Sequence, residues 1–344
     1  MVDADPVCTV PFVTDDLVTG VEAAILGAMR KQDVEPWLDE VLRRCVGTEL
    51  AHVVFRSGRI DAVYGVATVD GRELVIKVHR PPVDVDARSN VVAAQRILVE
   101  AGFPCARPLG GPATIDGPVV TVETLLTGGR PGDGHDAEIR RSVAAGLSQQ
   151  IDLLRQHPDL VTNAGAPPAW YQYQDGPWPT PHDSIFDFSA TPDGYQWLDD
   201  FARDVATILT TSPRGDDVVV GHADWYCGNL RFADTTVVAT FDWDLVADTT
   251  AMVAGFTAGA YTMGEAPGAG PPSPDEVTAF VADVEQAQGR PFDAGERRLA
   301  VAAACWNLAY SARCDLAMLD GRPQPGSALD LLDRNRQEYL DLRW

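Results

Sequence analysis

The sequence predicts an α+β fold in which a small β-rich lobe precedes a larger, mainly helical lobe. Residues 51–79 contain three strand-like runs separated by the turns Ser57-Gly58-Arg59 and Asp70-Gly71, the second of which is a strong hairpin signal. Residues 136–341 carry apolar side chains mostly at helical spacing. At roughly 150 residues per domain, a chain of 344 residues is long enough for two such lobes.

The small lobe is expected to span residues 47–126, after a helical extension at residues 1–46. In the extension, residues 14–46 have helical spacing and Thr14 is a suitable N-cap. The predicted elements of the lobe itself are strands at 51–56, 61–68 and 73–79, a helix at 86–101 and a last strand within 118–126.

The large lobe is expected to span residues 127–344. Ser273, Pro274 and Glu276 supply an N-cap, an N1 proline and an acidic first turn in the order that starts a helix. Residues 158–194, rich in proline and aromatic residues, are predicted as an insertion whose rings either wall a ligand site or form a small core. Helices are predicted at 136–156, 195–211, 248–263, 274–288, 293–320 and 327–341.

The composition restricts the classes of partner. Apolar residues make up 45% of the chain, which excludes a chain that is disordered throughout. Lys and Arg number 27 against 50 Asp and Glu, and the net charge of −23 opposes binding to nucleic acid or to an anionic membrane. An acidic surface also serves solubility, so the charge favours a cationic small molecule without identifying one.

The cysteines and the N-terminal residues predict a cytoplasmic protein. The six cysteines form no C-x-x-C pair and lie far apart, which fits reduced thiols better than a zinc site or a disulfide framework. The acidic first residues lack the basic start of a signal peptide. No apolar run approaches the roughly 20 residues that cross a bilayer, so we expect no membrane segment. The sequence leaves the oligomeric state open.

Lysine is rare in this chain and one lysine interrupts an apolar strand. Lys31 and Lys77 are the only two lysines, and Lys77 lies within the apolar run 74–78. A compact ammonium at such a position is a candidate for pairing with nucleotide phosphates. The alternative is an ordinary outward-facing lysine on an edge strand.

The segment 218–244 carries the strongest chemical pattern. A predicted strand delivers Asp224 and Asn229 on a short polar loop, and a returning strand brings Asp242 back toward the same end. Phosphoryl transfer needs a divalent cation held by hard oxygen ligands and a separate carboxylate that accepts the proton of the attacking hydroxyl. Asn229 and Asp242 suit the cation and Asp224 suits the hydroxyl, although each residue alone is a common turn former.

The order of these patterns resembles the aminoglycoside phosphotransferase family, whose members share the protein-kinase-like fold. The resemblance covers about residues 47–315 and is most specific in the H-x-D-x4-N and F-D-W motifs of 218–244. It implies a bilobal fold with a β-rich N-lobe and a helical C-lobe, and it implies ATP and Mg²⁺ as cofactors. By the same resemblance, Asp224 is the catalytic base and Asn229 and Asp242 are the Mg²⁺ ligands.

In the small lobe, the resemblance implies further nucleotide contacts. Lys77 would contact the α- and β-phosphates, and Ser57 and Gly58 would form the turn that covers them. The backbone around Glu123 would be the adenine-binding hinge. The family usually supplies a Glu from the small-lobe helix to pair with the lysine, but the stretch 90–95 contains none. The residues left to replace it are Gln95 and Glu100.

The acceptor is expected to be a small molecule. Asp244 is followed almost directly by an apolar helical segment, whereas a protein kinase would have a long polar activation segment there. We therefore predict transfer of the γ-phosphoryl of MgATP to a hydroxyl of a small acceptor, with the acidic balance favouring a cationic one such as an aminoglycoside or amino sugar. Trp225 and Tyr226 are predicted to line the acceptor pocket, and Asp244 and Asp248 to bind its positive groups.

An alternative is a catalytically weak nucleotide-binding regulatory protein of the same fold. The absence of a Glu in the small-lobe helix makes this alternative conceivable. Retention of Asp224, Asn229 and Asp242 favours the enzyme.

Overall fold

The computed structural model describes residues 20–27, 30–174, 176, 178–318 and 324–342. Its contacts divide the chain into two compact units: the first comprises the residues up to Val83 and residues 108–125, and the second comprises residues 84–107 and the chain from Leu126 onward. We describe each unit by itself. The predicted cap at Thr14 lies outside the described residues.

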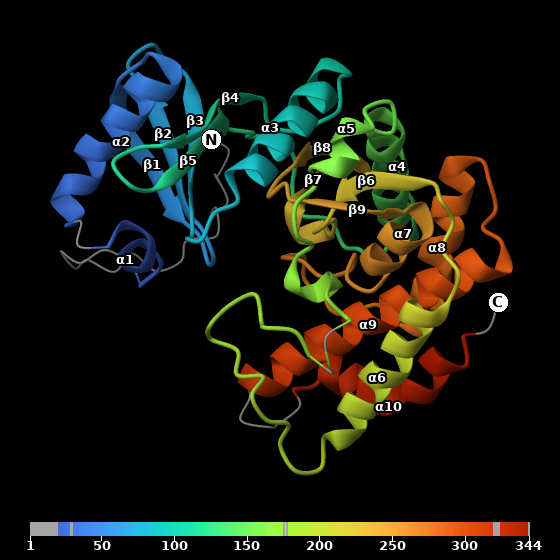
Figure 1. Ribbon diagram of the computed structural model, residues 1–344. Coiled ribbons are helices and arrows are strands. Elements are labelled where there is room, and N and C mark those ends of the chain that lie inside the picture. The colour runs from blue at the N-terminus through green and yellow to red at the C-terminus, as the bar shows by residue number, and fades with distance from the viewer. Residues whose placement is uncertain (1–19, 28–29, 175, 177, 319–323, 343–344) are drawn as a thin grey trace, which may run out of the picture. The chain divides into compact units, whose positions relative to one another are not determined.

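The first unit is built on a five-stranded antiparallel sheet with strand order β1-β2-β3-β5-β4 (Figure 1). The sequence predicts all of these strands except β4. That strand contains two prolines and two glycines, which weaken a strand pattern but are tolerated at the edge of a sheet. The elements of the unit are α1 Gly20–Leu26, α2 Lys31–Val46, β1 Leu50–Ser57, β2 Ala62–Thr68, β3 Glu73–His79, β4 Pro108–Thr114 and β5 Val119–Thr124.

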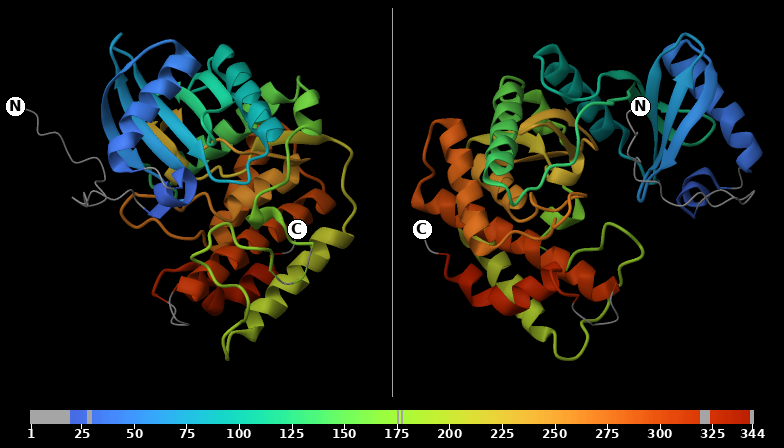
Figure 2. Two further views of the ribbon diagram at one scale, coloured as in Figure 1. Left: turned by 60° about the vertical axis from the view of Figure 1, so that its left-hand side comes forward. Right: turned by 180° about the vertical axis from the view of Figure 1, so that it is seen from behind.

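Helix α2 covers one face of this sheet, as the two views of Figure 2 show. Leu38 and Val41 of α2 belong to the same apolar cluster as Val66, Ile76 and Val122 of the strands. Successive side chains of a strand point to opposite faces. The residues that alternate with these apolar ones therefore lie on the face of the sheet opposite α2.

The second unit contains most of the helices and two small antiparallel sheets, β6-β9 and β7-β8. Its elements follow the predicted helices closely, with additional short elements inside the insertion. They are α3 Val85–Glu100, α4 Ala137–Leu154, α5 Asp159–Thr162, η1 Ala169–Tyr171, α6 Gln196–Thr211, β6 Val218–His222, η2 Cys227–Asn229, β7 Leu230–Ala233, β8 Thr236–Thr240, β9 Leu245–Thr249, α7 Thr250–Ala258, α8 Pro274–Gln288, α9 Ala294–Met318 and α10 Ala328–Leu340.

Helix α3 groups with the second unit, whereas the sequence places it in the small lobe. Its apolar side chains Val91 and Leu98 are buried in the same cluster as Val143 and Leu147 of α4. Helix propensity and periodicity predict that this helix forms, but they do not say which core its apolar face joins.

Helix α9 packs closely against α7 at the centre of the second unit. A Cβ atom at Gly255 of α7 would lie 2.2 Å from the carbonyl oxygen of Ala300, and one at Gly259 would lie 2.5 Å from that of Ala304. Glycine is therefore needed at both positions for the helices to approach. Helix α7 follows β9 directly.

Half of the six aromatic residues of the insertion at 158–194 are buried. Tyr171, Tyr173 and Phe186 are buried, and the ring of Tyr171 stacks on Phe256 of α7 with centroids 3.6 Å apart. Tyr171 and Tyr173 belong to the main apolar cluster of the second unit and not to a separate small core, and both also line a pocket described below.

The structure also bears on cysteine chemistry and on membrane spans. None of the five cysteines in the described part of the chain forms a disulfide. Among the helices of the described residues, none is long and apolar enough to cross a membrane.

Candidate active site

Strand β6 ends at His222, whose ring holds the loop that carries Asp224. The backbone amide of Asp224 donates to His222 Nδ1 over 3.0 Å, and His222 Nε2 lies 2.9 Å from the carbonyl oxygen of Phe241. An amide can only donate, so Nδ1 is the acceptor and the proton of the neutral ring sits on Nε2. His222 is fully buried and thereby connects the residue before Asp242 to the Asp224 loop.

Asn229 orients the carboxylate of Asp224. Its Nδ2 donates to Asp224 Oδ2 over 2.9 Å and to the Asp224 carbonyl oxygen over 3.0 Å. The backbone of Asn229 is held in turn by Tyr226 and Phe241. Both amide hydrogens are therefore directed at Asp224, so the side-chain oxygen is the atom of Asn229 that could coordinate a cation.

The carboxyl group of Asp224 is easily protonated. Burial raises its pKa to about 7, and the hydrogen bond from Asn229 opposes this rise. The negative charges of Asp244 and Asp242 raise it further. A carboxylate with a pKa near neutrality is suited to accepting a proton at physiological pH.

Asp242 has a left-handed backbone with φ of 51°, which is uncommon for a residue other than glycine. Its side chain is exposed, while the neighbouring Trp243 is buried with its Nε1 donating to Thr240. A strained backbone between two anchored neighbours is typical of functional sites. It presents the Asp242 carboxylate outward from the β8–β9 connection.

Asn229 and Asp242 fit a Mg²⁺ site that is completed by phosphate oxygens. Within the described ranges, no group of three or more His, Cys, Asp or Glu side chains is placed to hold a metal by itself. Mg²⁺ commonly binds through one or two protein carboxylates together with substrate phosphates and water. One amide oxygen and one carboxylate therefore match what Mg²⁺ requires when a nucleotide supplies the remaining ligands.

The two carboxylates expected to bind a cationic acceptor have arginine partners. Arg88 of α3 donates to Asp244 over 2.6 Å. Arg214 lies 3.1 Å from Asp248, whose side chain is 13% exposed. The negative charge of both groups is compensated within the protein, and neither arginine was assigned a role from the sequence.

Trp225 does not line an acceptor pocket. Its side chain is 2% exposed and its Nε1 donates to the carbonyl oxygen of Val143. Its ring packs against Phe103 and Trp243 in the core. Residues 223–229 alternate between buried and half-buried positions, and Trp225 occupies a buried one. Tyr226 is half-buried and its ring lies over Gly228.

In the first unit, Ser57, Lys77 and Glu123 share the sheet face opposite α2. Ser57 pairs with Val63, Val63 with Lys77, and Lys77 with Thr121, so these residues form one row across four strands. The ammonium of Lys77 lies 3.1 Å from Oε1 of Glu123. The strand β5 therefore supplies a carboxylate partner for this lysine.

Glu123 lies within β5, inside the five-stranded sheet. Its strand is paired with β3 on one side and β4 on the other, with Val75 and Pro108 opposite Glu123. Glu123 therefore contributes its side chain to the polar face, and an adenine contact through its backbone stays a prediction.

The turn at Ser57 and Gly58 requires glycine. Gly58 has φ of +123°, and a Cβ atom there would lie 1.9 Å from the backbone oxygen of Asp61. The carboxylate of Asp61 accepts from the amide of Arg80 and contacts the ring of His79 at 2.7 Å. The turn is thus tied to the end of β3.

Sequence reasoning missed the roles of His222 and of the Glu123 side chain. The sequence did contain a signal for Glu123. It stands two residues after Thr121 in an apolar strand, so the two side chains lie on the same face of that strand. His222 also pairs with Leu245 of β9, a strand that the sequence did not predict.

The chain is similar to known proteins in both sequence and structure. The model of the phosphotransferase enzyme family matches residues 52–253, more than half of the chain. A solved amicoumacin kinase, in complex with AMP-PNP, Ca²⁺ and its ligand Ami, is similar over 90% of this chain and 96% of its own, with 13% identity and a TM-score of 0.59. A type I macrolide 2′-phosphotransferase is similar over 88% of this chain and 95% of its own, with 16% identity and a TM-score of 0.52. No curated protein sequence matches the chain significantly.

The structural relatives confirm the expected kinase-like α+β fold with a β-sheet lobe and a helical lobe. The family model extends the similarity from the fold to the candidate site, because the matched residues include the Asp224 loop and Asp242. The chain belongs to the phosphotransferase enzyme family and is a small-molecule phosphotransferase.

Proposed function

We propose that this protein transfers the γ-phosphoryl group of MgATP to a hydroxyl group of a small acceptor, with Asp224 as the general base. One observation carries this proposal: Asp224 has a pKa of about 7 and a carboxylate that Asn229 holds in one orientation over 2.9 Å. Such a group is poised to accept the proton of an attacking hydroxyl. The oxygen of that hydroxyl then forms the new bond to phosphorus while the bond to ADP breaks.

The remaining residues would bind and orient the nucleotide. A bound Mg²⁺ supplies neutralisation of charge on the phosphoryl oxygens. Asn229 would offer its side-chain oxygen and Asp242 its exposed carboxylate to that ion. Lys77 would place its ammonium against the phosphates, held by Glu123 at 3.1 Å. The Gly58 turn would donate backbone N–H groups to the same phosphates.

The regulatory alternative has less support. It rests on the absence of a Glu in the helix at residues 85–100. Lys77 has a carboxylate partner in Glu123 nevertheless, so this absence does not leave the ammonium without an acidic neighbour.

The proposal is tested by ADP release in the presence of ATP, Mg²⁺ and a panel of acceptors: amino sugars, aminoglycosides, neutral glycosides, macrolides and choline-like alcohols. We expect Asp224→Asn to lower kcat by about 10²–10⁴-fold and Asp242→Asn to abolish Mg²⁺-dependent turnover. Asp333→Asn, an exposed carboxylate on α10, is the matched control. Wild-type turnover by Asp224→Asn would show that another group is the base.

A further inference from the structure

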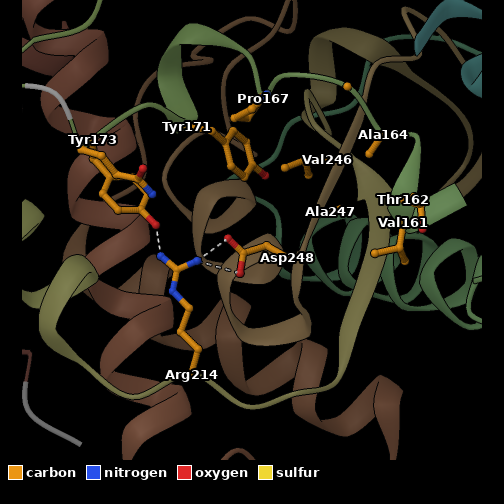
Figure 3. Close-up of a pocket in the computed structure, with 12 residues that line it drawn as sticks. Val161, Thr162, Ala164, Pro167, Tyr171, Tyr173, Arg214, Val246, Ala247 and Asp248 are labelled. Carbon is orange, nitrogen blue, oxygen red and sulfur yellow. Dashed lines mark hydrogen bonds and ion pairs between the residues drawn. The ribbon is translucent and has the colours of Figure 1, made fainter. Parts of the chain in front are cut away.

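A pocket of about 240 Å³ lies in the second unit between β9 and the insertion (Figure 3). Its walls include Val246, Ala247 and Asp248 of β9 and the segment 161–174. A cavity of roughly 150 Å³ accepts a benzene molecule. The volume of this pocket therefore suits one six-membered ring with substituents, and it is too small for a complete oligosaccharide.

The pocket adjoins the loop of the proposed base. Trp170, the neighbour of Tyr171, donates its Nε1 to the carbonyl oxygen of Ala223 over 3.0 Å. Val246 of the wall pairs with Gly221 of β6. The pKa of the Tyr171 phenol is raised chiefly by burial, and the charges of Asp248 and Asp224 raise it further. These contacts place Tyr171 within the electrostatic reach of Asp224.

The hydroxyl group of Tyr171 has no hydrogen-bond partner among the described residues. The residue is 5% exposed, its ring is fixed by stacking on Phe256, and Figure 3 shows its hydroxyl directed toward Val246. Leaving a buried polar group unsatisfied costs about 1–3 kcal/mol. Because its pKa is raised, the hydroxyl stays protonated and can donate to a ligand oxygen.

The charges that line the pocket are already paired with each other. Arg214 contacts Asp248 through Nη1 and contacts the hydroxyl of Tyr173 through Nη2 (Figure 3). A cationic ligand would have to compete with Arg214, which lies 3.1 Å from Asp248, to gain the charge of that carboxylate. The pocket therefore favours an uncharged ligand, contrary to the expectation from the net charge.

We propose that this pocket binds one uncharged, oxygen-bearing ring of the acceptor, of the neutral glycoside class, and that Tyr171 donates a hydrogen bond to an oxygen of that ring. This inference rests on the proposed function, because the ring belongs to the molecule whose hydroxyl Asp224 would deprotonate. The apolar side chains of Val246 and Ala247 contact the ring, while the Arg214–Asp248 pair selects against amino sugars.

Kinetics with matched acceptors test the specificity. We expect a higher kcat/KM for neutral glycosides than for polycationic amino sugars. Tyr171→Phe should raise KM for the neutral acceptor by about tenfold or less. Ala247→Leu, which fills part of the pocket, should raise the same KM. Tyr261→Phe is the control, since its hydroxyl is also buried without a partner among the described residues but lies outside this pocket.

A binding measurement separates this inference from the proposed function. Saturation-transfer NMR with a methyl glycoside and the Asp224→Asn variant reports binding without turnover. Binding that Tyr171→Phe weakens supports the pocket, even if no acceptor releases ADP and the proposed function fails. Binding that Tyr171→Phe leaves unchanged, or preferred turnover of polycations, overturns the inference while leaving phosphoryl transfer in place.

Discussion

Lys77 and Glu123 form an ion pair between adjacent strands of the first sheet, with Nζ 3.1 Å from Oε1. Both side chains are largely buried, at 13% and 9% exposure, on the face opposite α2. Glu123 stands diagonally across from Lys77, since Val75 is its direct partner. This pair restrains the ammonium by β-sheet geometry, because both residues lie on paired strands of one sheet.

Glu123→Gln is expected to weaken nucleotide use. The neutral amide still fills the space but removes the charge that holds Lys77, so we expect kcat/KM for ATP to fall by roughly tenfold, as for one charged hydrogen bond. The measurement is ADP release at varied ATP concentration. Glu338→Gln, an exposed residue of α10, is the control. An unchanged kcat/KM for ATP would mean that the pair has no role in nucleotide binding.

Asp224→Asn is expected to stabilise the fold at high pH while it reduces activity. The folded-state pKa of Asp224 is raised to about 7 from its ordinary value of 3.8, so its ionised form is disfavoured in the folded state. Stability is therefore lost as pH rises between these two values. In metal-free buffer, the Tm of the variant should exceed that of the wild type by more at about pH 8 than at about pH 5. An equal difference at both pH values would contradict the raised pKa.

Gly58→Ala is expected to impair ATP binding through its turn. The new Cβ atom would collide with the backbone oxygen of Asp61 at 1.9 Å, and φ of +123° is unfavourable for alanine. We expect KM for ATP to rise several-fold. Gly71→Ala is the control, because Gly71 also has a positive φ of +83° but a Cβ atom there meets nothing within 4 Å. Equal effects of the two substitutions would rule out a specific role of the Gly58 turn.

His222→Ala is expected to destabilise the second unit. The substitution removes the acceptor for the amide of Asp224 and the donor to the carbonyl of Phe241, and it leaves a cavity in a fully buried position. We expect a decrease of about 2–4 kcal/mol in the free energy of unfolding, measured by urea denaturation. His52→Ala on exposed strand β1 should change it little. A near-neutral His222→Ala would show that the backbone holds the loop without this ring.

The local elements could be predicted because their signals are local. The cap and N1 proline before α8 and the Asp70-Gly71 turn between β2 and β3 depend on residues close in the chain, and both form where the sequence predicts. Asp224 and Asn229 lie between β6 and β7, and Asp242 lies between β8 and β9, in the order that the sequence predicts. Strand β4 was missed because its prolines and glycines form a strand only when β5 lies beside them.

The sequence by itself determined the α+β class, most helix limits and the residue types that phosphoryl transfer needs. Tertiary structure alone decided which charges meet: Lys77 with Glu123, Asp244 with Arg88, and Asp248 with Arg214. It also decided that Trp225 is buried and that Tyr171 lines a pocket. The reason is physical, because periodicity follows from backbone geometry within one segment, whereas ion pairs and burial depend on segments that lie far apart in the chain.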